Sequence, residues 1–301
     1  MTNRLSIVGA PSSAGAYAPG QEQAPAALRE IGFLRMLTER GIRFHDRGDV
    51  AGFRWRPDKA NPSAMNVGDA TRVARAVSQQ VAAALADRDR VLVIGGDCTV
   101  ELGTVSGALQ DTTSVGVVYI DLDTDLNTPE STSDGALDWM GVAHLLAIPG
   151  SLAELAGLGP RTPMLTPGQV LFFASDNVEP FERDLITTLG IDEVGLAEVQ
   201  ADPAGAAEAV VNGWARQFER LLVHVDIDVL DYADTPLAEN TRRNWGLRCD
   251  QLMQALNAFL KAPNWTALTI CELNPDHGES DGATLRPFGE SLADALRAPL
   301  A

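Results

Sequence analysis

The stretch "SVGVVYIDLDTDLN", residues 114–127, joins an apolar run to three aspartates at alternate positions. The run over 114–121 is rich in valine, which is typical of a strand buried on both faces of a sheet. It leads into Asp121, Asp123 and Asp125, so one buried strand brings three carboxylates to the same place. Because sites in open α/β sheets form just beyond the carboxyl ends of the strands, we expect chemistry here.

Seven further runs of this kind alternate with helical patterns along the chain. In the stretch 69–88, valines at intervals of four form one apolar stripe, and further helices are expected over 25–40 and 249–262. Such alternation predicts an α/β fold in which helices cover both faces of a parallel sheet. The seven runs cover residues 5–10, 42–46, 90–97, 169–175, 193–199, 221–228 and 267–274.

Composition and charge exclude several classes of protein. The 301 residues suffice for one large α/β domain or two small ones, and we find no internal repeat or low-complexity linker. With 23 basic and 41 acidic residues the net charge is −18, which argues against a nucleic-acid partner. No apolar run reaches the ~18 residues of a membrane helix. The widely spaced Cys98, Cys249 and Cys271 form no CxxC pair and indicate a reducing cytoplasm.

Three other predicted strands also end in acidic residues. Asp97 follows the glycine pair 95–96, which we expect to turn the backbone tightly. Asp226 and Asp228 alternate in the next such segment and would share a face if the strand persists, with His224 just behind them. Glu272 ends another strand. In a parallel sheet all these ends meet at one edge.

Carboxylates crowded at one edge repel each other unless a cation joins them or some of them take up protons. Hard divalent ions favour clustered oxygen ligands, and two metals bridged by carboxylates are a familiar hydrolytic arrangement. The alternative is that single aspartates are helix caps or solvated loop residues. A metal site at this edge is the hypothesis that accounts for all the acidic strand ends together.

Five segments of the chain stand out together, in this order: "GAPSSAGAYAPGQEQAPAALREIG" (9–32), "GGDCT" (95–99), "IDLDTDLNTPESTSDGALDWMG" (120–141), "VDIDVLD" (225–231) and "ELNP" (272–275). As an ordered set they resemble the ureohydrolase family, which includes arginase and agmatinase. The resemblance covers most of the chain and implies a three-layer α/β/α domain over 1–301, with a mainly parallel sheet of eight strands. It also implies two Mn²⁺ ions, hydrolysis of a guanidinium group with release of urea, and homo-oligomers, either trimers or hexamers.

The resemblance assigns roles to individual positions, and three histidines of the family are replaced. Cys98 and Asp123 stand where the family has histidine ligands, and Asp138 stands where it has a proton-shuttling histidine. Glu272 matches the glutamate that holds the guanidinium group. A thiolate prefers softer ions, so Zn²⁺ or Fe²⁺ becomes possible beside Mn²⁺, with one or two ions bound. The matched metal-binding aspartates are Asp121, Asp125, Asp226 and Asp228.

Alternatives stay open at three positions. Cys98 is either a ligand or a small buried hydrophobe at a strand end. His224 either restores a nitrogen ligand, supports the ligands from behind, or is a core histidine with a backbone partner. His277, in the loop after Glu272, is a candidate replacement for the missing proton shuttle.

The substrate loops depart from the arginase pattern as well. Asn127 is kept, but Asp134 stands where arginases have a serine that reads the substrate carboxylate, and Glu179 aligns with the position that holds the α-amino group. A carboxylate at 134 would repel a substrate carboxylate at close range. The resemblance therefore implies a metal-dependent hydrolase for a cationic or modified guanidine rather than free arginine. The alternative, motivated by the lost histidines, is a non-hydrolytic protein that binds a ligand or regulates a partner.

Overall fold

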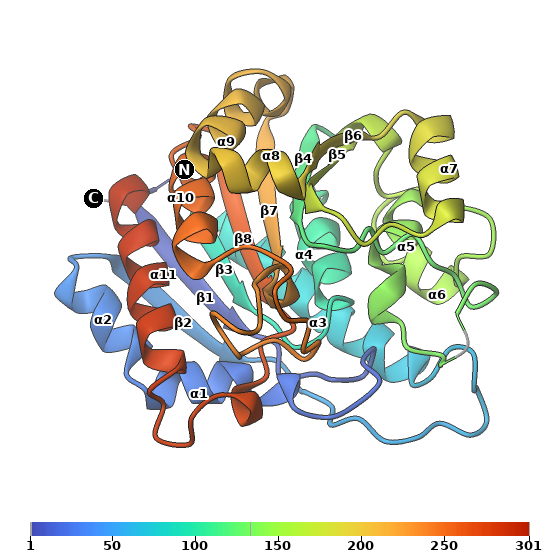
Figure 1. Ribbon diagram of the computed structural model, residues 1–301, viewed down its shortest axis with the longest axis horizontal. Coiled ribbons are helices and arrows are strands. Elements are labelled where there is room, and N and C mark those ends of the chain that lie inside the picture. Colours follow the sequence, from blue (N-terminus) through green and yellow to red (C-terminus); the bar gives the residue numbers. More distant parts are fainter. Residues whose placement is uncertain (1, 133, 301) are drawn as a thin grey trace.

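In the computed structural model, which describes residues 2–132 and 134–300, eight parallel strands form one sheet in the order β2-β1-β3-β8-β7-β4-β5-β6 (Figure 1). The expected eight-stranded parallel sheet is thus confirmed. Each of the eight predicted runs corresponds to one strand, with ends that differ by a few residues. The strands are β1 (Arg4–Gly9), β2 (Arg43–Asp49), β3 (Arg90–Ile94), β4 (Val115–Ile120), β5 (Val170–Ser175), β6 (Asp192–Gly195), β7 (Arg220–Asp226) and β8 (Trp265–Cys271).

Two hydrophobic clusters, one on each face of the sheet, make three layers. Alternate residues of a strand serve opposite clusters: in β4, Val118 and Ile120 belong to one cluster, whereas Val117 and Tyr119 belong to the other. The first cluster is covered by α1 (Ala24–Glu30), α2 (Phe33–Glu39), α8 (Leu196–Ala201), α9 (Pro203–Asn212), α10 (Cys249–Leu260) and α11 (Leu285–Leu300). The second is covered by α3 (Val67–Ala86), α4 (Val100–Ala108), α5 (Gly141–Leu146), α6 (Ala153–Ala156) and α7 (Pro180–Leu189).

Short 3-10 helices complete the structure, and several of them lie in the loops that follow strands. In the described part of the chain, none of the helices combines the length and apolar character needed to cross a membrane. The 3-10 helices are η1 (Gln21–Gln23), η2 (Asp138–Met140), η3 (Pro167–Gln169), η4 (Trp214–Gln217), η5 (Ile227–Val229) and η6 (Pro275–His277).

Two predicted elements were wrong in extent. The single helix expected over 25–40 is two helices, because Gly32 adopts a left-handed conformation (φ 85°) between α1 and α2. The strand expected over 193–199 ends at Gly195, and α8 begins at the next residue. Leu196 and Val199 then lie three residues apart on one buried helical face, a spacing that suits a helix and not a strand.

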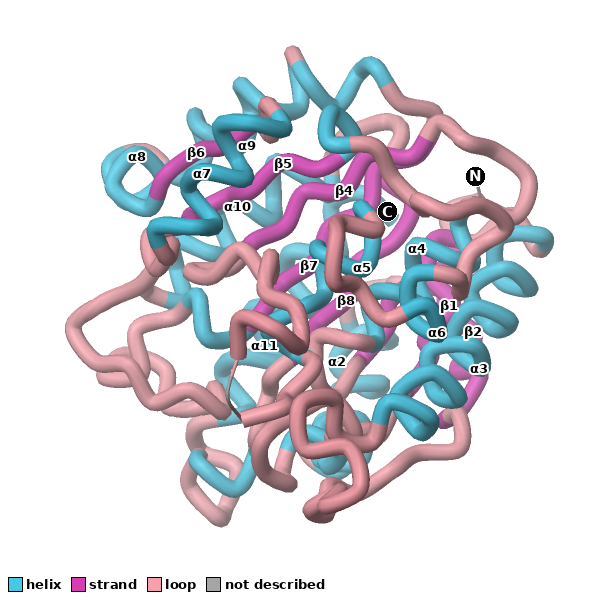
Figure 2. Tube along the Cα trace, turned by 90° about the vertical axis from the view of Figure 1, so that its right-hand side faces the viewer, coloured by secondary structure: helices cyan, strands magenta, loops and turns pink. Residues whose placement is uncertain are grey.

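The strand order places four carboxyl ends side by side at the centre of the sheet. β3, β8, β7 and β4 are consecutive neighbours, although β3 and β8 are separated by most of the sequence. Figure 2 shows three of them, β4, β7 and β8, in magenta between β5 and β1, with helices on either side of the sheet. The acidic segments that follow these four strands are therefore brought together.

Candidate functional site

A cavity lies where the four central strands end, and acidic side chains dominate its lining. It measures about 320 Å³, part of which is open to solvent, and eight of its eleven lining residues are aspartate or glutamate. Tyr17 and Trp139 add aromatic surface. The lining residues are Tyr17, Asp121, Asp123, Asp125, Asp138, Trp139, Asp226, Asp228, Glu239, Asn240 and Glu272.

The segment after β4 presents its three aspartates through a tight turn and not through a continued strand. The strand ends at Ile120, and Asp121 Oδ1 accepts a hydrogen bond of 2.8 Å from the backbone N–H of Asp123. Asp125 adopts a left-handed backbone conformation (φ 49°), and its Oδ2 accepts a hydrogen bond from the Tyr119 hydroxyl. A non-glycine residue held in this region is strained, which is common at functional sites.

The segment after β7 repeats this arrangement. We expected a strand through Asp228, but the strand ends at Asp226 and the 3-10 helix η5 follows. Asp226 Oδ1 accepts a hydrogen bond of 2.7 Å from the backbone N–H of Asp228. Both carboxylates still line the cavity. The turn, rather than strand periodicity, is the reason that they point to the same place.

The aspartates have free oxygen atoms that suit a cation. Among the described residues, the buried Asp121 Oδ2 and Asp228 Oδ1 have no hydrogen-bond partner. Carboxylate oxygens of Asp121, Asp123 and Asp228 lie within 4.8 Å of one another, as do ligand atoms of Asp121, His224 and Asp226. Such sets fit the oxygen-rich coordination that hard divalent ions prefer. The donor set therefore fits at least one divalent ion.

The pKa shifts of the cavity aspartates show that a bound cation would be favourable there. Burial, followed by the charges of neighbouring carboxylates, raises the pKa of Asp121 and of Asp226 well above the ordinary range. Burial and the charge on Asp123 raise the pKa of Asp228 to about 6, although Arg242 opposes them. Without a bound cation, each of these side chains therefore keeps its proton to higher pH than it would in water.

Arg242 is a charged residue of the site that sequence reasoning missed. Its Nη1 donates a hydrogen bond of 2.8 Å to Asp123 Oδ2 and lies 3.9 Å from Asp228 Oδ2. The other oxygen of Asp123 accepts a hydrogen bond from the Asn177 side chain. Asp123 is therefore already paired. The available signal was an arginine in the irregular segment 229–247 that directly follows β7.

Glu272 and Asp138 flank the aspartates within the cavity. Glu272 Oε1 accepts a hydrogen bond of 3.0 Å from the backbone N–H of Cys98, and its Oε2 accepts one of 2.9 Å from Gln21 Nε2. Asp138 Oδ1 accepts a hydrogen bond of 3.0 Å from the backbone N–H of Trp139. Burial, then the charges of nearby carboxylates, raises the pKa of Asp138 well above its ordinary value. Glu272 is thus oriented, and Asp138 keeps its proton to higher pH than an ordinary aspartate does.

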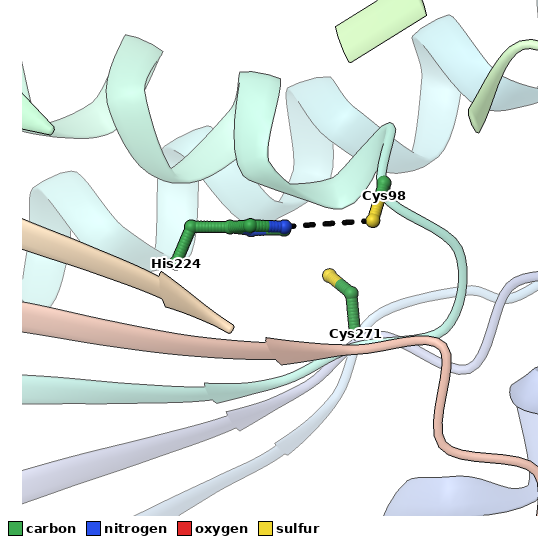
Figure 3. Close-up of side chains that lie close together, drawn as sticks. All are labelled: Cys98, His224 and Cys271. Carbon is green, nitrogen blue, oxygen red and sulfur yellow. Dashed lines mark hydrogen bonds between the residues drawn. The ribbon is translucent and has the colours of Figure 1, made fainter. Parts of the chain in front are cut away.

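Cys98 and His224 lie below the cavity floor and are fully buried. The Cys98 thiol donates a hydrogen bond of 3.0 Å to Asp226 Oδ2, and its Sγ lies 3.5 Å from His224 Nε2. The imidazole stacks on the Tyr119 ring, with 4.0 Å between ring centroids. Cys271 joins them from the end of β8 (Figure 3). Sequence reasoning missed Cys271, although it directly precedes Glu272.

The backbone bends at Gly96 and Asp97 and turns at Cys98 and Thr99, as expected, and the glycine pair also provides clearance for a neighbouring loop. Neither Gly95 nor Gly96 has a positive φ angle. A Cβ atom on Gly96 would lie 1.6 Å from the carbonyl oxygen of Ser12. The backbone of the loop after β1 therefore passes directly against residue 96, and only glycine leaves room for it.

The remaining predicted residues lie outside the cavity lining. The Asn127 amide donates a hydrogen bond of 3.3 Å to Glu182 Oε1, and the exposed Asp134 accepts one of 3.1 Å from the Ala136 backbone. Glu179 is exposed at the start of α7. His277 Nδ1 lies 2.7 Å from the Ala238 carbonyl oxygen. The substrate-binding and proton-shuttle roles assigned to these residues stay predictions.

Comparisons with known proteins agree with this architecture. A model of the arginase family matches residues 3–295. Arginase-1 of Rattus norvegicus is 29% identical over 299 residues, which cover 97% of this chain and 91% of that protein. Arginase of Agrobacterium fabrum is 29% identical over 278 residues, covering 89% and 83%. The structure of arginase from Bacillus caldovelox superposes with a TM-score of 0.86 at 21% identity and covers 99% of both chains.

Proposed function

Because the chain belongs to the arginase family, we propose that it is a metal-dependent hydrolase that cleaves a C–N bond of a guanidino or amidino compound. One observation carries the proposal: all four aspartates that match the family's ligand positions line one cavity together with Glu272. The aspartates are Asp121, Asp125, Asp226 and Asp228.

The carboxylates of this chain would hold the metal and the substrate. Asp121 Oδ2 and Asp228 Oδ1, which have no hydrogen-bond partner among the described residues, are available to an ion. A bound divalent ion supplies the Lewis acidity that lets water attack at neutral pH. Glu272, held at both oxygens by Cys98 and Gln21, presents its remaining lone pairs to the N–H groups of a guanidinium.

Asp138 is the residue of this chain best suited to protonate the leaving nitrogen. Burial and its acidic neighbours raise its pKa, which favours the protonated form that a proton donor needs. A proton donor aimed at the leaving group contributes typically about 10²–10⁴-fold to rate. Asp138→Asn should lower kcat by such a factor and leave metal content unchanged, whereas the exposed Asp134→Asn is the matched control for metal content.

The charge of the cavity favours a cationic substrate over free arginine. Eight carboxylates line it, and a potential of one sign concentrates ligands of the opposite sign. Trp139 offers an indole face, a good partner for a guanidinium cation. Agmatine-like amines, hydroxyguanidines and arginine derivatives without a free carboxylate fit this chemistry. A free substrate carboxylate would be repelled.

The test measures metal content and urea or amine release from agmatine, arginine amide, hydroxyguanidine and arginine, with Mn²⁺, Fe²⁺ or Zn²⁺ added. Turnover of the cationic guanidines, with arginine slower, supports the proposal. Asp121→Ala should abolish binding at the carboxylate site. Absence of both bound metal and turnover would overturn the proposal, and faster turnover of arginine would overturn the substrate preference.

One observation favours a second candidate function, a non-hydrolytic protein that binds a ligand or regulates a partner. Arg242 already supplies a cation to Asp123 and lies close to Asp228. A protein in which this guanidinium takes the place of a metal ion would bind its ligand without hydrolysing it. The same experiment separates the two candidates: cationic guanidines that bind without being hydrolysed, whether or not metal is present, would support the second.

A further inference from the structure

Three soft ligands converge below the carboxylate cavity. Cys98 comes from the loop after β3, His224 from β7 and Cys271 from the last position of β8 (Figure 3). All three are at most 1% exposed, and their sulfur and nitrogen atoms lie within 4.8 Å of one another. Figure 3 shows the imidazole edge and both sulfur atoms directed toward one common space. Adjacent strands supply the three residues, so the group is built into the sheet.

The spacing matches the edge of a tetrahedral metal site. With Zn–S and Zn–N bonds of about 2.3 and 2.0 Å, a tetrahedral ion holds its sulfur and nitrogen ligands about 3.5 Å apart. Cys98 Sγ and His224 Nε2 are 3.5 Å apart. We propose that Cys98, His224 and Cys271 bind a soft divalent ion, Zn²⁺, with Asp226 as the fourth ligand. Asp226 Oδ2 lies 3.0 Å from Cys98 Sγ and so borders the same space.

Glu101 provides an independent reason to expect an ion there. This glutamate, in the first turn of α4, is 1% exposed, and neither of its carboxylate oxygens has a hydrogen-bond partner among the described residues. Its Oε2 lies 3.7 Å from His224 Nδ1, which is also without a partner there. Histidines that bind a metal through one nitrogen commonly present the other to a carboxylate. Glu101 thus occupies the supporting position for a metal bound to His224 Nε2.

Two metal-free arrangements account for less of this geometry. A disulfide between Cys98 and Cys271 would leave the Glu101 carboxylate and the His224 imidazole buried with only each other, at 3.7 Å, as charged partners. An ion network of thiolate, imidazolium and carboxylate accounts for the charges, but not for the convergence of two sulfurs and one nitrogen on one space. A soft ion satisfies all four groups at once.

This site shares Cys98 and Asp226 with the set of ligands that the family resemblance implies, whereas its other two ligands, His224 and Cys271, are outside that set. Cys271 and His224 lie one and two residues before Glu272 and Asp226, deeper in the sheet. The soft ligands suit Zn²⁺, whereas Asp121, Asp123 and Asp228 offer oxygen only. The proposal does not require hydrolysis, because Zn²⁺ bound here would fix three strand ends even in a protein without turnover.

The test uses Co²⁺ as a spectroscopic probe for Zn²⁺ on the full chain, purified with a reductant and a chelator that is then removed. Wild type should bind Co²⁺ with an intense thiolate-to-cobalt band in the near ultraviolet, and Zn²⁺ should displace the Co²⁺. Cys249→Ser, which alters the third cysteine in α10, is the matched control and should keep the band. Cys271→Ser should lose most of it.

Glu101→Gln tests the supporting role. Loss of such a partner typically weakens metal binding by about 10–100-fold, and the thiolate band should remain once the site is filled. Because Cys271→Ser can fail to fold, X-ray absorption of zinc-loaded wild type gives a second readout. Sulfur neighbours at about 2.3 Å and nitrogen at about 2.0 Å are expected. Zinc bound only by oxygen, a Co²⁺ complex without the thiolate band, or a Cys98–Cys271 disulfide that forms in preference to zinc binding would overturn the proposal.

Discussion

Replacement of Arg242 by glutamine should lower stability in a chelator and raise metal affinity. Nη1 lies 2.8 Å from Asp123 and 3.9 Å from Asp228. At an effective dielectric constant of about 20, these separations correspond to attractions of about 6 and about 4 kcal/mol. Much of this attraction offsets the cost of taking the charges out of water. Removing one partner of a buried pair costs about 3–5 kcal/mol, and we expect about 3 because the Arg242 side chain is 15% exposed.

A divalent ion should bind Arg242→Gln more tightly, because no fixed cation then competes for Asp123 and Asp228. If the bound Mn²⁺ regains about 1.4 kcal/mol of the attraction that Arg242 provided, the dissociation constant for Mn²⁺ falls about tenfold. Urea denaturation with and without Mn²⁺ measures the stability change, and calorimetric titration measures the affinity. Arg243→Gln is the control, since Arg243 stacks on Tyr232 and makes no ion pair with the described aspartates of the cavity. Arg242→Gln with lowered stability and unchanged Mn²⁺ affinity would refute competition between the guanidinium and the metal.

Three further predictions concern pH and packing. The pKa of Asp228 is raised to about 6, so the stability that this side chain contributes is present below about pH 4 and is lost as the pH rises through 6. Protein kept in a chelator should therefore melt at a lower temperature at pH 7 than at pH 5. Added Mn²⁺ should remove this difference. The pKa of buried Asp89 is lowered, because Arg4, Ser6 and Thr2 together outweigh its burial, so its contribution is present above its ordinary pKa and lost in acid. Asp89→Asn should lower the free energy of unfolding by about 1–3 kcal/mol at pH 7. In urea denaturation, the difference in this free energy between the variant and wild type should shrink below pH 4, and a difference that does not change with pH would contradict the assignment. Gly96→Ala should destabilise by at least about 1–3 kcal/mol through contact with Ser12, whereas Gly68→Ala, with no atoms within 4 Å, should be neutral or stabilising.

The strands were predictable because buried parallel strands leave a local signal, a short continuous apolar run. All eight runs became strands, including the edge strand β6, whose extent was wrong because the run continued into a helix. The convergence of acidic strand ends on one edge also follows from parallel topology. The order of the strands, with β8 and β7 between β3 and β4, came only from the structure.

Partners that meet only through tertiary structure were not predictable from local sequence. Arg242 lies 119 residues from Asp123 in the chain, and Cys271 lies 173 residues from Cys98. Nothing near either residue indicates such a contact. The turns that carry Asp123 and Asp228 were also missed, since alternate spacing alone does not distinguish a continued strand from a capped turn.

The position of β7 and β8 also has a consequence for the order of folding. These two strands are the last in the sequence, yet they separate β3 from β4 in the sheet. During synthesis, the strands up to β3 and the strands from β4 to β6 have no shared edge until the final third of the chain arrives. Long-range pairing of this kind folds slowly. Asp226, Asp228 and Glu272 join the aspartates that follow β4 only at that last step, so cations available at the end of synthesis would act directly on the step that closes the sheet.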